Sequence, residues 1–140
     1  MGIGSKPFRV DLVTPHKAEP PIQCTYAVVP AWDGEIGFLL GRSPLICKLG
    51  AGELRVETGN SHVQRFYVQS GFAEMLNDVL TVITERAEPA AAIDPDEAAG
   101  QLDEARRLSA KDESSAADRE RRVAAARARL RVARKAQRGP

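Results

Sequence analysis

The 140-residue sequence has little of what membrane proteins, metal proteins and many enzymes need. No run approaches the roughly 18 consecutive apolar residues that a bilayer-spanning helix requires. The two histidines, His16 and His62, are far apart, and neither has a cysteine or aspartate at ligand spacing, so we expect no metal site. No G-x-S-x-G motif marks a nucleophilic serine, and nothing else marks a catalytic centre or a cofactor site. These absences favour a binding or coupling protein over an enzyme.

Cysteine and aromatic residues are also scarce. Cys24 and Cys47 each lie in a β-like apolar run, and we expect reduced thiols rather than a disulfide. Aromatic residues make up 5% of the chain, and none follows Phe72. The first residues lack the apolar stretch of a signal peptide and the Arg- and Ser-rich character of a transit peptide. We therefore expect the protein to stay in the compartment where it is made.

Residues 33–44, DGEIGFLLGRSP, place three glycines and a proline in an otherwise apolar run. Their spacing fits neither a phosphate loop, which ends in Gly-Lys-Ser/Thr, nor a dinucleotide loop, which needs G-x-G-x-x-G before a helix. The residues that follow alternate like a strand, so no helix N-terminus is positioned to receive an anion. The stretch is predicted to turn the chain within a β domain and to present a surface.

Up to about Glu88 the dominant period of hydrophobicity is two. Gly, Asn, Pro and Asp separate short alternating runs, which are FRVDLV, TYAVVP, ICKLGAGELRVE, HVQRFYVQ and VLTVIT. Gly59-Asn60 and Asn77-Asp78 are hairpin candidates, because these residue types tolerate a positive φ. The pattern predicts an all-β sandwich or barrel over residues 1–88.

After Glu88 the period becomes helical. Asp94 is a good N-cap, Pro95 suits the first helical position, and Glu97 follows three residues after the cap. The first helix has an apolar face formed by Ala98, Leu102, Ala105 and Leu108. The second helix has a narrower apolar stripe formed by Ala116, Val123, Ala126, Leu130 and Ala133. We expect an antiparallel helix hairpin over residues 93–137. The hairpin has few large apolar side chains of its own, and burying them does not offset the entropy cost of ordering its residues. We therefore expect the hairpin to need a partner surface, and to be able to detach from one surface and bind another.

The net charge of +1 conceals a strong asymmetry, because residues 114–140 carry +7 and residues 85–113 carry −5. A basic helix of this kind fits a solvated face opposite the acidic first helix, a nucleic-acid contact, or a contact with an acidic protein surface. Nucleic acid is disfavoured, because no aromatic residue is present for base stacking and the arginines surround the helix.

Two blocks of this sequence resemble the epsilon subunits of the rotary F-type ATP synthases, called delta in mitochondria. Gly34-Glu35-Ile36-Gly37 matches the family's Gly-Glu-x-Gly, and Gly41, Pro44 and Leu45 match its next motif, with Arg42 in place of a usual His. The second block, from Gly71-Phe72-Ala73-Glu74 to Leu80-Thr81-Val82, is similar to the family's GGF-E…N-VTVL. The resemblance implies a β-sandwich of short antiparallel strands followed by a C-terminal α-helical hairpin, with no active site.

The resemblance also implies partners. The sandwich would dock on the gamma stalk and on the c-ring of the membrane, and would couple rotation to proton flow. By position, the residues for that contact are Asp33, Glu35, Gly37 and Arg42. The hairpin would lie folded on the sandwich or extend into the alpha/beta catalytic head and inhibit ATP hydrolysis, through Arg119, Arg122, Arg127 and Arg129. The protein would lie peripherally on the cytoplasmic side of a bacterial inner membrane.

Some members of the family bind ATP through Ile/Leu-Asp-x-x-Arg-Ala. The nearest match here is residues 93–98, IDPDEA, in which Glu97 stands at the arginine position, and residues 102–107 are a displaced second candidate. Because a carboxylate repels phosphate, we expect weak or absent ATP binding and no cofactor. The alternative hypothesis is a free-standing adaptor whose arginine-rich helix binds nucleic acid or an acidic protein surface.

Overall fold

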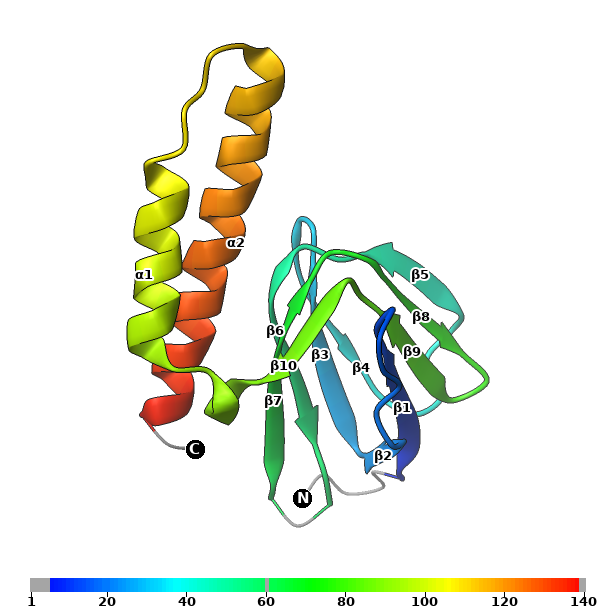
Figure 1. Ribbon diagram of the computed structural model, residues 1–140. Coiled ribbons are helices and arrows are strands. Elements are labelled where there is room, and N and C mark those ends of the chain that lie inside the picture. Colours follow the sequence, from blue (N-terminus) through cyan, green and yellow to red (C-terminus); the bar gives the residue numbers. More distant parts are fainter. Residues whose placement is uncertain (1–5, 60, 139–140) are drawn as a thin grey trace.

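The computed structural model describes residues 6–59 and 61–138. Two five-stranded sheets pack face to face, and two helices lie against one of them (Figure 1). The predicted turn at Gly59-Asn60 falls partly on Asn60, which lies outside the described residues. The β-sandwich followed by a helical hairpin is confirmed.

The sheet farther from the helices, here called the outer sheet, contains β1 (Phe8–Val13), β2 (Ile22–Cys24), β5 (Leu45–Lys48), β8 (Phe72–Leu76) and β9 (Val79–Ile83). Its strand order is β2-β1-β9-β8-β5. The other sheet, here called the inner sheet, contains β3 (Tyr26–Ala31), β4 (Gly34–Phe38), β6 (Ala51–Glu57), β7 (Val63–Gln69) and β10 (Arg86–Pro89). Its order is β10-β7-β6-β3-β4. Neighbouring strands pair antiparallel, except that β1 and β9 are parallel.

The period of two in the sequence places alternate side chains between the sheets. In β1 and β9 the fully buried residues are Val10, Leu12, Leu80 and Val82. They pack in one cluster with side chains from the inner sheet that include Phe38, Leu54 and Val56. This apolar core holds the sandwich together.

The run ICKLGAGELRVE, expected as one strand, is divided between the two sheets. It supplies β5 to the outer sheet and β6 to the inner sheet, and the chain crosses at Leu49 and Gly50. The Leu49 N–H donates to Gly71 O at 2.8 Å and the Gly50 N–H to Pro30 O at 2.9 Å, so the crossing keeps its backbone hydrogen bonds. Strands β2, β4 and β10 were not among the expected strands, and β10 is followed by a short 3-10 helix, η1 (Ala90–Ala92).

The two helices are α1 (Pro95–Arg106) and α2 (Glu113–Gln137), and they form the expected antiparallel hairpin (Figure 1). Asp94 caps α1 as predicted, because its side chain accepts from the Asp96 N–H at 3.0 Å. Asp112 and Ser115 form a reciprocal capping box at the start of α2. Leu108, expected on the apolar face of the first helix, lies beyond its end and is 40% exposed. Neither helix is long and apolar enough to cross a bilayer, within the part of the chain that the structure describes.

The hairpin rests on the inner sheet, where α2 contacts β6, β7 and η1. The shared core is small, as expected, because many of its members are alanines: Ala90, Ala98, Ala128 and Ala133, with Ile93, Leu102, Leu130 and Val132. Tyr67 of β7 completes it and is fully buried. The largest side chain buried in this shared core therefore belongs to the sandwich.

Candidate functional site

The four residues predicted to contact a ring and stalk lie within β4 or just beyond its ends, and β4 is an edge strand of the inner sheet. Asp33 lies in the turn before β4, Glu35 and Gly37 lie within it, and Arg42 lies beyond its other end. Because the five residues of β4 extend over about 13 Å, Asp33 and Arg42 lie beyond opposite ends of the strand. The structure therefore arranges these residues along one exposed edge and does not bring them into one cluster.

The three glycines of this stretch have different roles. Gly34 and Gly41 have φ values of +145° and +82° and lie at the two turns that bound β4. Gly37 is in the strand itself, where a Cβ would lie 2.5 Å from the Tyr26 hydroxyl. The expectation that all three glycines turn the chain is thus wrong for Gly37, which makes room for a neighbouring side chain.

Two contacts fix the turn after β4. The Gly41 N–H donates to Asp78 Oδ1 at 2.9 Å, which ties this turn to the one between β8 and β9. The Arg42 guanidinium lies 5.2 Å from the centre of the Phe38 ring. Arg42 is thereby held at the surface with its charge exposed.

Trp32 was not among the predicted site residues. It lies beside Asp33 in the turn between β3 and β4 and is 70% exposed. It is also the single tryptophan of the chain. The sequence contained a usable signal, which is a lone tryptophan directly before the turn residues Asp33 and Gly34. Large aromatic side chains are enriched at protein interfaces.

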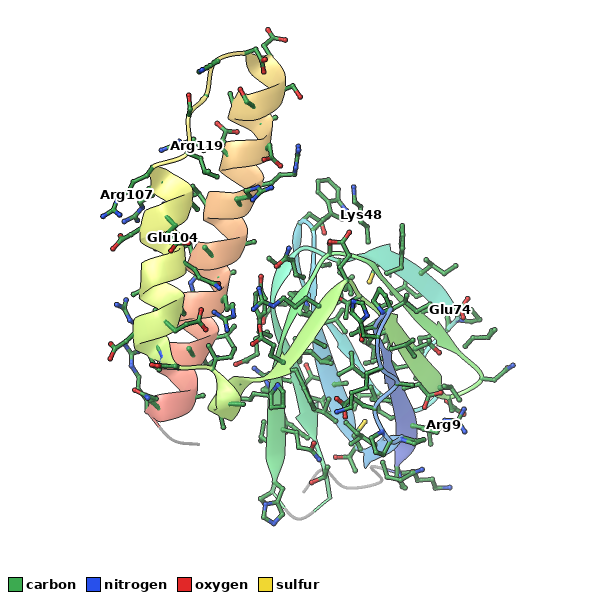
Figure 2. All side chains as sticks on the ribbon, viewed as in Figure 1. Arg9, Lys48, Glu74, Glu104, Arg107 and Arg119 are labelled. Carbon is green, nitrogen blue, oxygen red and sulfur yellow. The ribbon has the colours of Figure 1, made fainter. Side chains whose placement is uncertain are left out.

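The solvent-facing side of the outer sheet carries large apolar residues, here called the outer apolar face: Ile46, Phe72, Leu76 and Ile83. Their exposed fractions lie between 44% and 65%. Phe72 and Ile83 are direct cross-strand partners, whereas Ile46 pairs with Glu74, which lies between Phe72 and Leu76 along β8. Figure 2 shows Glu74 and Arg9 on this side of the sandwich, away from the hairpin. A contiguous exposed apolar patch with charges among it is typical of a protein interface.

The four arginines predicted to contact a catalytic head have different surroundings. Arg119 Nη2 donates to the Arg106 carbonyl at 2.8 Å, and Arg122 Nε donates to Asp118 Oδ2 at 2.9 Å. Arg127 is exposed, whereas Arg129 is 4% exposed. With the hairpin folded on the sandwich, Arg129 is not available to a partner.

Arg129 joins the sandwich and both helices through two carboxylates. Its Nε and Nη2 donate to Glu88 of β10 at 2.8 and 3.0 Å, and its Nη2 and Nη1 donate to Glu97 of α1 at 2.9 and 3.0 Å. Its Nη1 also donates to Gln101 Oε1 at 3.1 Å. These bonds lower the pKa of Glu97 and raise the pKa of Arg129. We call Glu88, Glu97 and Arg129 the arginine clasp.

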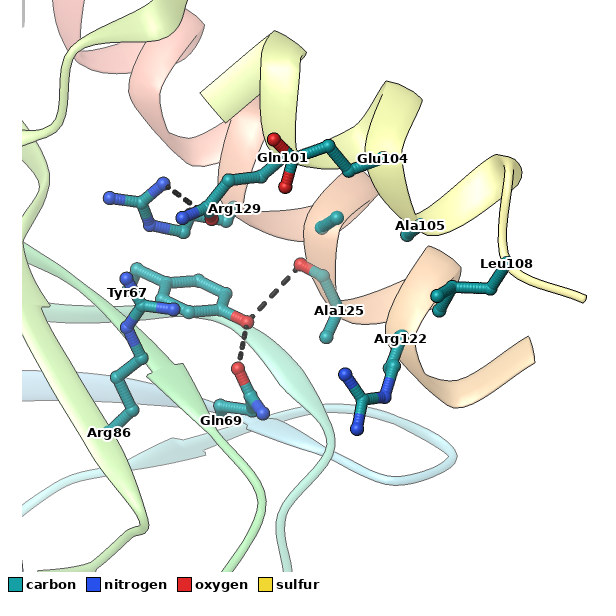
Figure 3. A pocket seen from close by; sticks show the side chains of 11 residues that line it. Tyr67, Gln69, Arg86, Gln101, Glu104, Ala105, Leu108, Arg122, Ala125 and Arg129 are labelled. Carbon is teal, nitrogen blue, oxygen red and sulfur yellow. Dashed lines mark hydrogen bonds between the residues drawn. The ribbon is translucent and has the colours of Figure 1, made fainter. Parts of the chain in front are cut away.

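A cavity of about 310 Å³ adjoins the clasp, between the sandwich and the hairpin (Figure 3). Arg86, Arg122 and Arg129 line it with Tyr67 and Glu104. The Tyr67 hydroxyl lies 2.9 Å from Gln69 Oε1 and 3.2 Å from the carbonyl of Ala125 in α2, and burial raises the pKa of Tyr67 to about 12. Tyr67 is thus a second polar link between the two parts, and it stays neutral over the physiological range.

Glu97, which replaces the arginine of the ATP-binding pattern, therefore provides an internal anion for Arg129. The expectation of weak ATP binding stays a prediction. In residues 6–59 and 61–138 no group of three or more His, Cys, Asp and Glu side chains is placed to hold a metal ion.

Comparison with known proteins identifies related sequences over the whole fold. A family model described as the β-sandwich domain of the ATP synthase delta/epsilon chain matches residues 7–90. The ATP synthase epsilon chain of Rhodopirellula baltica is 37% identical over 127 residues, which cover 91% of this chain and 98% of the relative. The epsilon chain of Parvibaculum lavamentivorans is 33% identical over 115 residues, or 82% and 84% of the two chains.

Solved structures share the fold. A chain in the Euglena gracilis mitochondrial ATP synthase, in a structure of OSCP, F1 and c-ring, superposes with a TM-score of 0.76 and 24% identity over 90% of this chain and 82% of that chain. A chain from the central stalk and c-ring of the Tetrahymena thermophila mitochondrial enzyme gives a TM-score of 0.68 and 12% identity over 89% and 95% of the two chains.

Proposed function

The chain belongs to the family of ATP synthase delta/epsilon chains, and from this premise we propose that it is a non-catalytic central-stalk subunit of an F-type ATP synthase. In this role it couples rotation of the gamma stalk to the membrane c-ring during proton-driven ATP synthesis. It lies peripherally on the cytoplasmic side of a bacterial inner membrane. The sandwich of residues 1–88 acts as the docking unit and the hairpin of residues 93–137 as the regulatory unit.

The observation that carries the docking role is the outer apolar face. Ile46, Phe72, Leu76 and Ile83 are exposed together on the sheet that the hairpin leaves uncovered. Burying such side chains against a partner yields about 25 cal/mol for each Å² of apolar surface removed from water. We assign this face to the gamma subunit.

The exposed edge along β4 supplies the second contact. Asp33, Glu35 and Arg42 offer charges of both signs, which suits the polar loops of a c-ring. Gly37 acts indirectly, since it lets Tyr26 pack behind the strand. Trp32 at the end of this edge adds an aromatic anchor.

The hairpin provides inhibition of ATP hydrolysis when it leaves the sandwich and enters the alpha/beta head. Two features support a detachable hairpin. Its shared core is small and contains four alanines. Its polar links to the sandwich are the bond from Arg129 to Glu88 in the arginine clasp, Tyr67, and the contact of Lys135 with Glu53 at 3.4 Å. Detachment from Glu88, together with separation of α2 from Glu97 of α1, would free Arg129 to join Arg119, Arg122 and Arg127 on an acidic target in the head.

The test is ATP hydrolysis by a catalytic head depleted of this subunit, to which the full chain or a version ending at Ala92 is added back. Capture on immobilised gamma subunit, measured in parallel, reports docking and the integrity of the shortened sandwich. We expect both versions to bind gamma and only the full chain to slow hydrolysis. Binding without inhibition by either version would refute the inhibitory role alone. Failure of the full chain to bind would refute the stalk assignment and favour the adaptor hypothesis.

A further inference from the structure

A groove on the hairpin is lined by six cations and two leucines. The lining residues are Leu102, Arg106, Arg127, Leu130, Arg131, Arg134, Lys135 and Arg138, and the volume is about 540 Å³. We call it the basic groove. All of its lining residues belong to the hairpin, so it is distinct from the cavity beside Tyr67.

The cations of the basic groove form an ordered row. Residues 127, 131, 134, 135 and 138 follow the spacing that places side chains on one face of a helix, and Arg106 of α1 joins them from the facing helix. Eleven residues of helix extend over about 17 Å. Leu102 and Leu130, each 6% exposed, form a fixed floor, because both are held in the hairpin core.

The charge of this row is not neutralised within the described residues. None of the five groove arginines has a carboxylate within 4.0 Å there, whereas Arg129 has two, and Arg121 and Arg122 share Asp118. Residues 121–140 contain no Asp or Glu. Of the groove cations, Lys135 alone has an ion pair in the described part, with Glu53.

Helix electrostatics explain only part of this pattern. Cations in the last turn stabilise the negative end of a helix, which accounts for Arg106 in α1 and for Arg134 and Lys135 in α2. Arg127 and Arg131 lie more than one turn before Gln137, where this effect has faded. Their position beside the other cations raises the energy of the free hairpin through like-charge repulsion.

The chemistry of the lining restricts the ligand. Arginine and lysine side chains donate hydrogen bonds and accept none, and leucine does neither. A nucleotide, an oligonucleotide or a peptide would bring amine, hydroxyl or amide donors that these side chains cannot satisfy. The lining also lacks an aromatic ring for stacking on a base. A ligand that has only hydrogen-bond acceptors, with several negative charges along a chain, matches this lining. Phosphate groups fit this description, and arginine side chains bind them in a bidentate manner.

We propose that the basic groove is a binding site for condensed inorganic phosphate, with Arg106, Arg127, Arg131 and Arg134 as its principal ligands. A bound phosphate chain bridges α1 and α2 and removes the repulsion between their cations. The site belongs to the hairpin and does not depend on docking to gamma, so either proposal can fail without the other.

The test is isothermal titration of the full chain with sodium tripolyphosphate at low ionic strength. We compare Arg127→Gln/Arg131→Gln with Arg107→Gln/Arg121→Gln, a matched pair of exposed arginines outside the groove that removes the same charge. Far-UV circular dichroism verifies that the helices are retained in both. We expect the first variant to weaken binding by about tenfold or more, since it removes two bidentate donors, and the second by less than about twofold.

Each other outcome would overturn the proposal. Absence of binding to the wild-type chain, or equal weakening by the two variants, would mean that the charge acts only as a diffuse field. Tighter binding of ATP than of tripolyphosphate would mean that a nucleoside is recognised. Equal binding of a polyglutamate peptide or a single-stranded oligonucleotide would assign the groove to an acidic protein or to nucleic acid.

Discussion

Arg127 and Arg129 are two residues apart in α2, yet their side chains lie in opposite environments. An α-helix turns by about 200° over two residues, so one side chain reaches solvent and the other reaches the sandwich. The Arg129 side chain is 5% exposed between Glu88 and Glu97. An unpaired charge in such a place is costly, and the clasp is stable only while all three members are present.

The first prediction compares Arg129→Met with Arg127→Met. Removing Arg129 leaves two carboxylates close together at the edge of a buried site. Because Glu88 and Glu97 remain 25% and 45% exposed, we expect a loss of about 1–3 kcal/mol in the stability of the docked hairpin. Arg127→Met should change it by less than about 0.5 kcal/mol. Hydrogen exchange of the α2 amides measures both, and equal effects would contradict a special role for the clasp.

The second prediction concerns pH. The hydrogen bond from Arg129 lowers the pKa of Glu97 below its ordinary value of 4.5 in the folded protein. A group with a lowered folded pKa stabilises fully above its unfolded pKa and loses this contribution as the pH falls through the folded value. Because Glu97 and Arg129 belong to α1 and α2, we expect the packing of the two helices against each other to weaken below about pH 4.5. In Glu97→Gln this component of the pH dependence should vanish, which chemical shifts of α2 between pH 7 and pH 3 will test.

At the scale of the elements, the two faces of the outer sheet differ in what they contact. The side that faces the inner sheet contributes to the core. The side that faces solvent is the outer apolar face. The hairpin covers the inner sheet, through β6 and β7. The outer sheet and the β4 edge therefore remain for partners, which is why the next two predictions address them.

The third prediction is that Phe72→Glu prevents docking on gamma. The substitution removes the apolar ring that pairs with Ile83 and puts a second carboxylate beside Glu74, and this added charge would be desolvated when gamma binds. We expect the affinity for immobilised gamma to fall by about tenfold or more. Leu108→Glu, which changes a leucine that is 40% exposed in the link between the helices, is the control and should bind as the wild-type chain does. Equal binding of both variants would place the gamma contact elsewhere.

The fourth prediction is that Glu35→Lys weakens assembly with the c-ring and leaves the fold intact. Glu35 is exposed in β4 and forms no ion pair among the described residues, so its replacement removes no internal contact. Trp32, close by at the end of the same edge, provides the readout, because its fluorescence should shift to shorter wavelength when the ring covers it. Unchanged assembly and coupling in the variant would remove the β4 edge from the ring contact.

The elements also show what the sequence could and could not predict. The alternation of apolar residues predicted the sandwich, and the cap at Asp94 predicted where the first helix begins. The division of one apolar run into β5 and β6 was not predictable, because alternation continues through the crossing at Leu49 and Gly50. Strand β10 was missed because Arg86–Pro89 is polar and ends in proline. The burial of Arg129 depends on Glu88, 41 residues away, so local pattern contained no sign of it.

At the scale of the whole molecule, the proposed function requires the hairpin to move between two surfaces. Folded on the sandwich, it buries Tyr67 and closes the clasp. Extended, with α2 also separated from α1, it would expose Tyr67 and release Arg129 from both Glu88 and Glu97 for an acidic target. A ligand or partner shifts such an equilibrium only by the difference in its affinity for the two states. In the proposed function, the clasp stabilises the folded state alone, and its strength would set the threshold for inhibition.

The last prediction follows from this threshold. Glu97→Gln removes one carboxylate from Arg129, while Glu120→Gln removes the same charge from an exposed position of α2. Each 1.4 kcal/mol lost from the folded state raises the ratio of extended to folded hairpin about tenfold. We therefore expect Glu97→Gln to inhibit ATP hydrolysis by the reconstituted head at lower concentration than the wild-type chain, and Glu120→Gln to match the wild type. Weaker inhibition by Glu97→Gln would mean that the folded hairpin, with its clasp closed, is the inhibitory form.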